Sequence, residues 1–211
     1  MNHTSSILQI LHSIPFELPN TDRWSLNRFV QIWKSHLNNP KSYNRVLKFT
    51  NNDYEVFSLP YYPHHQEKLI IKFNVTNISK LLSDNRIQFT THLFSDMYSV
   101  TRFNYHPNTT FDLSGFDQHI VAINLPCYQC GKYSFFEIID GNHRLSSIVD
   151  NNYDAHISVI DNYYLLPDCF VSDSDFCLFH VIQGIAWLTL TRIDAERYVK
   201  NLSTFLNSVH P

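Results

Sequence analysis

The chain has 211 residues, of which 44% are hydrophobic and 15% aromatic, so it is long enough to bury a substantial core. Its formal net charge of −3 argues against a protein whose main work is non-specific DNA binding, because such a protein needs a basic surface. The most apolar run, Leu178–Leu190, is too short to cross a bilayer and predicts a buried helix instead.

The N-terminal third of the chain predicts a helix and a β-hairpin. Within Asp22–Leu37, apolar residues recur at the spacing of one helix face, at Leu26, Phe29, Val30, Trp33 and Leu37. Two later segments, Arg45–Thr50 and Tyr54–Leu59, alternate on either side of an Asn-Asn-Asp turn, which is typical of a hairpin. We therefore assign residues 1–66 to an accessory N-terminal element.

The next region predicts a strand followed by a short helix. Lys68–Val75 has the composition of a strand, and a short helix follows that ends near Asp84. Residues 85–110 are rich in aromatic side chains that fit neither the helical nor the strand period. The cations and histidines of this segment fit solvated or core-edge positions better than catalytic ones: Arg86, Arg102, His92 and His106. His119–Leu125 predicts the next strand.

Two cysteines lie in the connection that follows this strand. Cys127 and Cys130 form a Cys-x-x-Cys pattern, but a tetrahedral zinc site needs four ligands. Cys169 and Cys177 do not form a second pair of that spacing, so zinc at Cys127 and Cys130 is disfavoured against a plain hairpin, with a redox pair as a further alternative. Four cysteines without a hydrophobic signal sequence predict reduced thiols in a cytoplasmic protein.

The stretch Tyr133–Ile160 contains the clearest pattern in the chain. Its apolar, β-forming start predicts a strand, and Asp140-Gly141-Asn142 predicts a turn. A short helix then begins at His143-Arg144, and a second strand follows at Ala155–Ile160. This order is βαβ-like and places a histidine and an arginine at a helix N-terminus, where backbone N–H groups and the helix dipole favour an anion.

An ordinary turn with a solvated arginine fits the same spacing. The chain contains only four glycines, which is far below the usual share of about 7%. Gly141 is therefore expected at a position where the backbone requires glycine, although scarcity alone does not say why.

The C-terminal part predicts two helices. The first covers about Ser174–Leu190, and a capping pattern at Thr191–Asp194 starts the second. Three basic residues on the second helix are too few for a recognition helix of the DNA-binding kind: Arg192, Arg197 and Lys200. The pair is better suited to covering a core or to forming a homodimer face.

The residues Glu137-Ile138-Ile139-Asp140-Gly141-Asn142-His143-Arg144-Leu145, followed by Ile157-Ser158-Val159-Ile160, resemble the second conserved box of the ParB/sulfiredoxin superfamily. In that box, a strand of the type YEIIDG runs into G-x-H-R or G-E-R-R, and a helix and a strand of the type IPVIV follow. The match is confined to this block. It implies an α+β fold with a mixed sheet and flanking helices over residues 67–165, with residues 166–211 as C-terminal helices.

The resemblance implies a nucleotide site at the turn. Backbone amides from Gly141 to Arg144, including that of Asn142, would hold a phosphate of ATP, ADP or CTP, and His143 and Arg144 would add charge-assisted hydrogen bonds. The reactive cysteine of sulfiredoxins lies in their own box, where this chain has Gly141 or Asn142. Sulfiredoxin activity is therefore disfavoured.

The same resemblance suggests catalytic roles. Asp140 would hold Mg²⁺ or orient the attacking group, since Mg²⁺ favours one or two carboxylates together with phosphate oxygens. His143 and Glu137 are the other catalytic candidates, and a structural pairing of Glu137 is an equal alternative. Asp117 and His119 are weaker candidates, because their strand is expected to run beside the box.

Members of the superfamily include sulfiredoxins, free serine kinases, ParB proteins with CTPase activity and ParB-like nucleases. We expect a magnesium-dependent nucleotide hydrolase or a kinase-like phosphotransferase that acts on a small-molecule or protein substrate. A ParB-like DNA-binding protein or nuclease is the first alternative, although the charge does not favour nucleic acid. A catalytically silent interaction module or effector is the second. No membrane association is expected.

Overall fold

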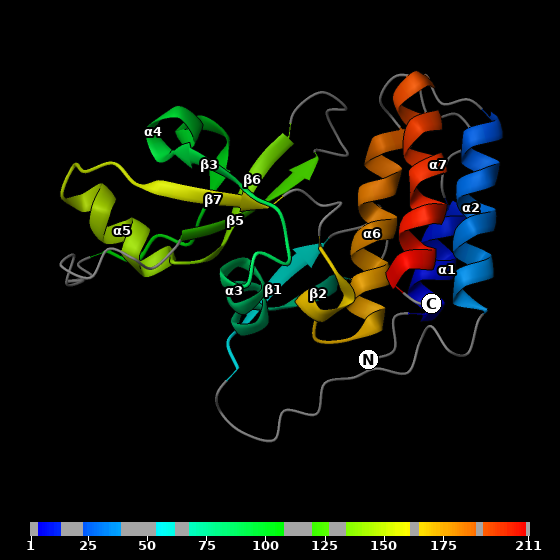
Figure 1. Cartoon of the computed structure of the whole chain (residues 1–211), viewed down its shortest axis with the longest axis horizontal. Helices are drawn as coiled ribbons and strands as arrows, with labels where there is room; N and C mark the ends of the chain where they lie inside the picture. The colour runs from blue at the N-terminus through cyan, green and yellow to red at the C-terminus, as the bar shows by residue number, and fades with distance from the viewer. Residues whose placement is uncertain are drawn as a thin grey trace. The chain divides into compact units, whose positions relative to one another are not determined.

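The computed structural model describes residues 4–13, 23–38, 54–61, 68–107, 120–126, 134–160, 165–188 and 192–209 (Figure 1). Over these residues the chain is a mixed α+β protein, as the sequence predicted. Its contacts form two compact units that interleave along the sequence. The first unit comprises residues 1–74, 126–133 and 166–211, and the second comprises 75–125 and 134–165. Within the described ranges, no helix combines the length and apolar character needed to cross a membrane.

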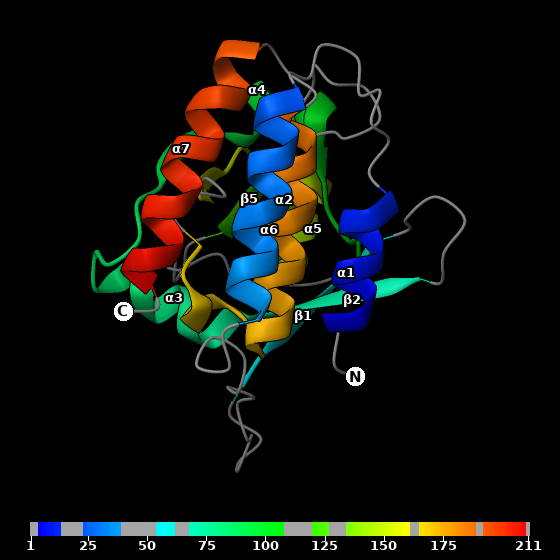
Figure 2. The ribbon, with the colours of Figure 1, turned by 90° about the vertical axis from the view of Figure 1, so that its right-hand side faces the viewer.

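The first unit is built mainly from helices: α1 (Thr4–Ser13), α2 (Arg23–Leu37), α6 (Asp173–Leu188) and α7 (Arg192–Val209). The helices α2, α6 and α7 run side by side in both views (Figures 1 and 2). Helix α6 is buried over almost its whole circumference, which explains why its sequence is apolar without a polar face. In the predicted apolar stripe of α2, Leu26, Phe29, Trp33 and Leu37 are buried, and Val30 is half-buried.

Gly184 allows close packing between these helices. A Cβ atom at Gly184 would lie 2.4 Å from Cε2 of Phe29 on α2 and 2.7 Å from the hydroxyl of Tyr198 on α7. The Tyr198 hydroxyl also donates a hydrogen bond to the His180 carbonyl at 3.4 Å. Only glycine leaves room for both neighbours, because interiors are packed without slack.

A two-stranded sheet completes the first unit. Strand β1 (Val56–Tyr61) pairs antiparallel with β2 (Leu69–Asn74). The Lys72 amide of β2 donates to the Asp175 carboxylate at the start of α6, at 3.0 Å. Phe73 is fully buried against the ring of Phe170, with ring centroids 5.1 Å apart. Phe170 follows the short 3-10 helix η4 (Pro167–Cys169).

This sheet corrects one expectation from the sequence. The strand predicted at Lys68–Val75 forms, but it belongs to the two-stranded sheet and does not open the core sheet. The predicted strand at Tyr54–Leu59 also forms, as β1, and its described partner is β2. Its predicted hairpin partner, Arg45–Thr50, lies outside the described residues.

The second unit contains a five-stranded mixed sheet with the strand order β3-β7-β5-β6-β4. Its strands are β3 (Thr90–Leu93), β4 (Thr101–Arg102), β5 (Ile120–Pro126), β6 (Ser134–Asp140) and β7 (His156–Ile160). Strand β7 is parallel to β5 and antiparallel to β3, and β4 is parallel to β6. The helical elements of this unit are α3 (Val75–Ser83), α4 (Phe94–Met97), η2 (Tyr98–Val100) and α5 (Asn142–Asp150).

The predicted strand, turn, helix and strand of the central block are all present, as β6, α5 and β7. Leu145 and Ile148 of α5 pack into a buried cluster with residues of β5, β6 and β7, among them Ala122, Ile138 and Ile157. The arrangement differs from a simple βαβ unit, because β5 lies between β6 and β7 in the sheet. The helix therefore packs across three neighbouring strands.

The structure also resolves the segment that the sequence pattern left undefined. Residues 85–107 contain β3, α4, η2 and β4, none longer than four residues. Helical elements this short do not complete two turns and the strands complete at most two alternations, which is too little for periodicity to reveal them. Residues 108–110 of that segment lie outside the described residues.

Candidate functional site

The turn between β6 and α5 has the geometry that requires glycine. Gly141 has a φ of +86°, in the left-handed region where a side chain is disfavoured. An added Cβ would also lie 3.1 Å from the Arg144 guanidinium and 3.1 Å from Ile120. The prediction that Gly141 meets a backbone requirement is confirmed, and its conformation turns the chain directly from strand into helix.

The first turn of α5 is a candidate anion-binding site. The Leu145 amide donates to the Gly141 carbonyl at 2.8 Å, and the amides of Asn142, His143 and Arg144 precede this bond at the positive end of the helix. No side chain caps this N-terminus. The position is one at which helices commonly bind phosphate or carboxylate groups.

Asp140 and Arg144 form an ion pair beside this turn. The Arg144 guanidinium donates to the Asp140 carboxylate at 3.3 Å, and both side chains are largely buried. The Ser79 hydroxyl of α3 donates to the other carboxylate oxygen at 3.4 Å. Asp140 therefore holds Arg144 near Gly141. The sequence did not indicate Ser79, because it lies 61 residues before Asp140 and a contact between residues so far apart leaves no local pattern.

A short segment after β4, Phe103–Pro107, lies along α5 and brings further groups to the site. The Asn104 amide donates to the Asn142 side-chain oxygen at 2.7 Å, and the Asn142 amide group donates back to the Ile138 carbonyl at 3.2 Å. The His106 amide donates to the Ser146 hydroxyl at 3.0 Å. Asn142 thus joins this segment to the end of β6, and its side chain serves the architecture of the turn.

His143 and His106 meet at the surface of the site. Their ring centroids are 3.9 Å apart and the rings are tilted by 55°. His143 is exposed and His106 is half-buried. The sequence singled out His143 but favoured a solvated or core-edge position for His106. That position is correct, and the structure adds that it places the ring next to His143.

Glu137 belongs to a different cluster from the other predicted site residues. It pairs in register with Arg102 on the neighbouring strand β4, and the Arg102 guanidinium lies 4.1 Å from the ring centroid of Phe135. Burial raises the pKa of Glu137 to about 7, and the Arg102 charge partly opposes this shift. Strand alternation places Glu137 on the face of β6 opposite to Ile138 and Asp140.

The remaining candidates divide between those placed elsewhere and those outside the described residues. His92 contacts Thr90 at 2.9 Å and the ring of Phe136, away from the α5 turn. Asp117, His119, Cys127 and Cys130 lie outside the described ranges. Among the residues that the structure does describe, no group of three or more His, Cys, Asp or Glu side chains is placed to hold a metal ion.

The site thus combines an uncapped helix N-terminus, a guanidinium held by a carboxylate, and two adjacent imidazoles. Groups of these kinds are the ones with which proteins commonly bind compact anions. Comparison of the chain with protein-family models, with curated proteins and with solved structures finds no match.

Proposed function

We propose that the second unit binds a nucleotide through a phosphate at the N-terminus of α5, as the resemblance to the ParB/sulfiredoxin box implies. The observation that carries this proposal is the turn itself: Gly141 at a φ of +86° leads into a helix with no side-chain cap. A bound phosphate would supply the partner that a capping side chain supplies in other helices.

The surrounding side chains have separate roles in this proposal. Arg144, which Asp140 orients at 3.3 Å, would bind a phosphate oxygen after a small change of rotamer. His143 is exposed at the same turn and would contact the terminal phosphate or the group that attacks it. His106 would orient the His143 ring, since the two ring centroids are 3.9 Å apart.

The donor set fits a phosphate better than it fits a dedicated metal site. Both oxygens of Asp140 already have partners, in Arg144 and Ser79. Asp140 would hold Mg²⁺ only by exchanging its contact with Ser79, with phosphate oxygens completing the coordination. When bound, Mg²⁺ would neutralise phosphate charge and so favour phosphoryl transfer or hydrolysis.

The reaction that fits this set is transfer of a phosphoryl group from the nucleotide to water or to a small-molecule or protein acceptor. An imidazole at the turn would accept the proton of the attacking hydroxyl, which is a common role of histidine in catalysis. We assign Glu137 no part in this step, because it lies with Arg102 and on the opposite strand face.

A thermal-shift series tests the proposal. ATP, ADP, CTP and GTP are added with and without Mg²⁺, and at least one should raise the melting temperature, since a ligand at 100 times its Kd adds about 2.7 kcal/mol of stability. Inorganic phosphate at the same concentration separates anion binding from nucleotide binding. If no nucleotide stabilises the protein under either condition, the proposal fails.

Variants then locate the site. Arg144→Ala and His143→Ala should each remove most of the nucleotide-induced shift. Arg86→Ala is the matched control, because Arg86 is an exposed arginine of the same unit that is not part of α5. Arg144→Lys should restore only part of the shift, because lysine keeps the charge but loses the planar fork. An undiminished shift in both alanine variants would place the nucleotide elsewhere.

A further inference from the structure

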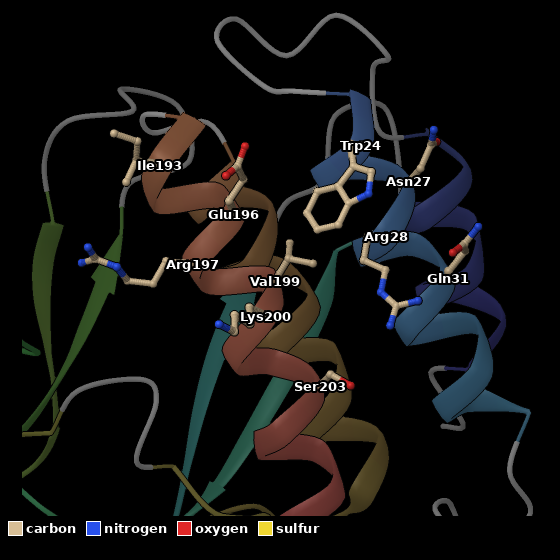
Figure 3. Close-up of a pocket in the computed structure, with 10 residues that line it drawn as sticks. All are labelled: Trp24, Asn27, Arg28, Gln31, Ile193, Glu196, Arg197, Val199, Lys200 and Ser203. Atoms are coloured by element: carbon tan, nitrogen blue, oxygen red, sulfur yellow. The ribbon is translucent and has the colours of Figure 1, made fainter.

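A groove runs between α2 and α7 in the first unit, with a volume of about 880 Å³ (Figure 3). Its lining residues on α7 extend from Ile193 to Ser203, which corresponds to about 15 Å of helix. Figure 3 shows the Trp24 indole between the two helices, close to Val199 and Glu196. All the residues that line the groove belong to the first unit, and the inference drawn from it does not rest on the function proposed for the α5 turn.

Two large apolar side chains are exposed at this groove. Trp24 is 58% exposed and Ile193 is 69% exposed, while Val199, which also lines the groove, is buried. Large apolar side chains that stay exposed at one groove are typical of binding surfaces.

Three cations line the same groove: Arg28 on α2 and Arg197 and Lys200 on α7. All three are exposed, and in the part of the chain that the structure describes none of them makes an ion pair or a hydrogen bond. Figure 3 shows Arg28 on α2, and it shows Arg197 and Lys200 on the side of α7 that faces away from α2. Glu196 also lines the groove, so cations outnumber carboxylates among its lining residues, although the net charge of the chain is −3.

We infer that this groove is a docking site for an acidic amphipathic helix of another protein. The apolar side of such a helix would lie over Trp24, Val199 and Ile193. Its carboxylates would face the cations that line the groove. A channel between two helices accepts a third helix by the ridge-and-groove packing that joins helices elsewhere in proteins.

Two other occupants fit less well. A second copy of the chain would bring the basic groove onto itself across a two-fold axis, which like charges oppose. A single-stranded nucleic acid would find one aromatic platform among the residues that line the groove, at Trp24, whereas proteins that bind single strands stack successive bases on several aromatic side chains. Ile193 offers no stacking surface for a base.

Fluorescence anisotropy with a designed probe tests this inference on the full-length chain. The probe is a labelled peptide of about 18 residues that repeats leucine and glutamate at helical spacing, so that it has one apolar and one acidic face. Two further probes are compared with it: a matched peptide with lysine in place of glutamate, and an oligo-dT strand. The acidic peptide should bind saturably and weaken as salt increases, whereas the lysine peptide should not bind.

Substitutions locate the binding surface. Arg28→Glu, Arg197→Glu and Trp24→Ala should each weaken binding of the acidic peptide about tenfold or more, because each removes or reverses a direct contact. Arg23→Glu is the matched control on α2, since Arg23 is exposed but does not line the groove, and it should leave the Kd within about twofold. Circular dichroism confirms that each variant is folded.

Three outcomes would overturn the inference. One is the absence of saturable binding of the acidic peptide up to about 100 μM. Another is binding that Arg28→Glu and Arg197→Glu leave unchanged. The third is tighter binding of oligo-dT with the same dependence on these residues, which would identify the groove as a nucleic-acid site.

Discussion

At the residue scale, single side chains or their absence decide the geometry of both units. Gly141 and Gly184 are required for different reasons. Gly141 occupies a left-handed backbone conformation, whereas Gly184 leaves space for Phe29 and Tyr198 in a tightly packed helical core. The scarcity of glycine predicted a backbone requirement at Gly141 and said nothing about Gly184, and the packing requirement at Gly184 is visible only from its neighbouring atoms.

Gly141→Ala should destabilise the second unit by about 1–2 kcal/mol, because a side chain at a φ of +86° is strained and its Cβ would crowd Arg144 and Ile120. Urea unfolding measures the loss. Gly141→Asn provides the control, since asparagine tolerates the left-handed region better than alanine. Equal losses for the two variants would identify the Cβ contacts, and not the backbone angle, as the main cause.

Glu137 should make stability depend on pH. Burial raises its pKa from 4.5 to about 7 in the folded state, so the folded protein keeps a proton that the unfolded chain has released. Stability from this group is present below pH 4.5 and is lost as the pH rises through about 7. Glu137→Gln should therefore become more stable relative to the wild type between pH 5 and pH 8, as followed by urea unfolding.

Arg102→Gln gives the complementary test, because the Arg102 charge lowers the pKa of Glu137. Without the Arg102 charge, the pKa of Glu137 should rise further. The variant should therefore lose more stability than the wild type as the pH rises, when both carry Glu137. If Glu137→Gln and wild-type stabilities run parallel from pH 5 to pH 8, the carboxyl does not titrate in this window.

At the element scale, the long periodic segments were predictable and the short ones were not. The helices α2, α6 and α7 and the block β6-α5-β7 formed where the patterns indicated, since each has enough residues to show its period. The elements between Thr90 and Arg102 have two to four residues each and left no readable pattern. The contact of Phe103–Pro107 with α5 was likewise unpredictable, because it joins residues about 40 positions apart.

Gly184→Ala should destabilise the helices of the first unit, although alanine is the better helix former by about 1 kcal/mol. The added Cβ would lie 2.4 Å from Phe29, so α2 or α6 must shift, at a cost of about 1–3 kcal/mol. Thermal unfolding followed by circular dichroism measures this loss. The double variant Gly184→Ala with Phe29→Leu makes space at that contact and should recover part of the stability. Stability unchanged in the single variant would show that the helices do not pack this closely.

At the scale of the whole molecule, the three consecutive regions predicted from the sequence do not match the grouping of contacts. The sequence suggested boundaries near residues 66 and 165, whereas the contacts join the N-terminal and C-terminal regions into one unit that also includes β2. Linear patterns cannot reveal this grouping, because the unit is assembled from segments separated by a second compact unit.

This grouping predicts how fragments behave. The fragment 75–165 contains the whole second unit together with residues 126–133, and should be monomeric and unfold cooperatively. The fragment 67–165 adds β2 without β1 and α6, and so exposes Ile71 and Phe73, which are buried in the full chain. It should self-associate in size-exclusion chromatography, because an unpaired apolar strand is a template for further pairing.

Ile71→Ser combined with Phe73→Ser in the longer fragment is the matched control and should reduce its association. A monomeric fragment 67–165 with the same thermal transition as fragment 75–165 would show that β2 does not depend on β1 and α6.

The sequence by itself determined the long helices, the central strand-turn-helix-strand block and the place where glycine was needed, because these features depend on neighbours within one or two turns of chain. Only the tertiary structure decided that β2 belongs to the two-stranded sheet and that Ser79 and Arg144 both contact Asp140. It also decided that the His106 ring lies next to the His143 ring and that Glu137 pairs in register with Arg102. Each of these depends on contacts between residues distant in the sequence, and such contacts form only when the chain has closed its loops around a common core.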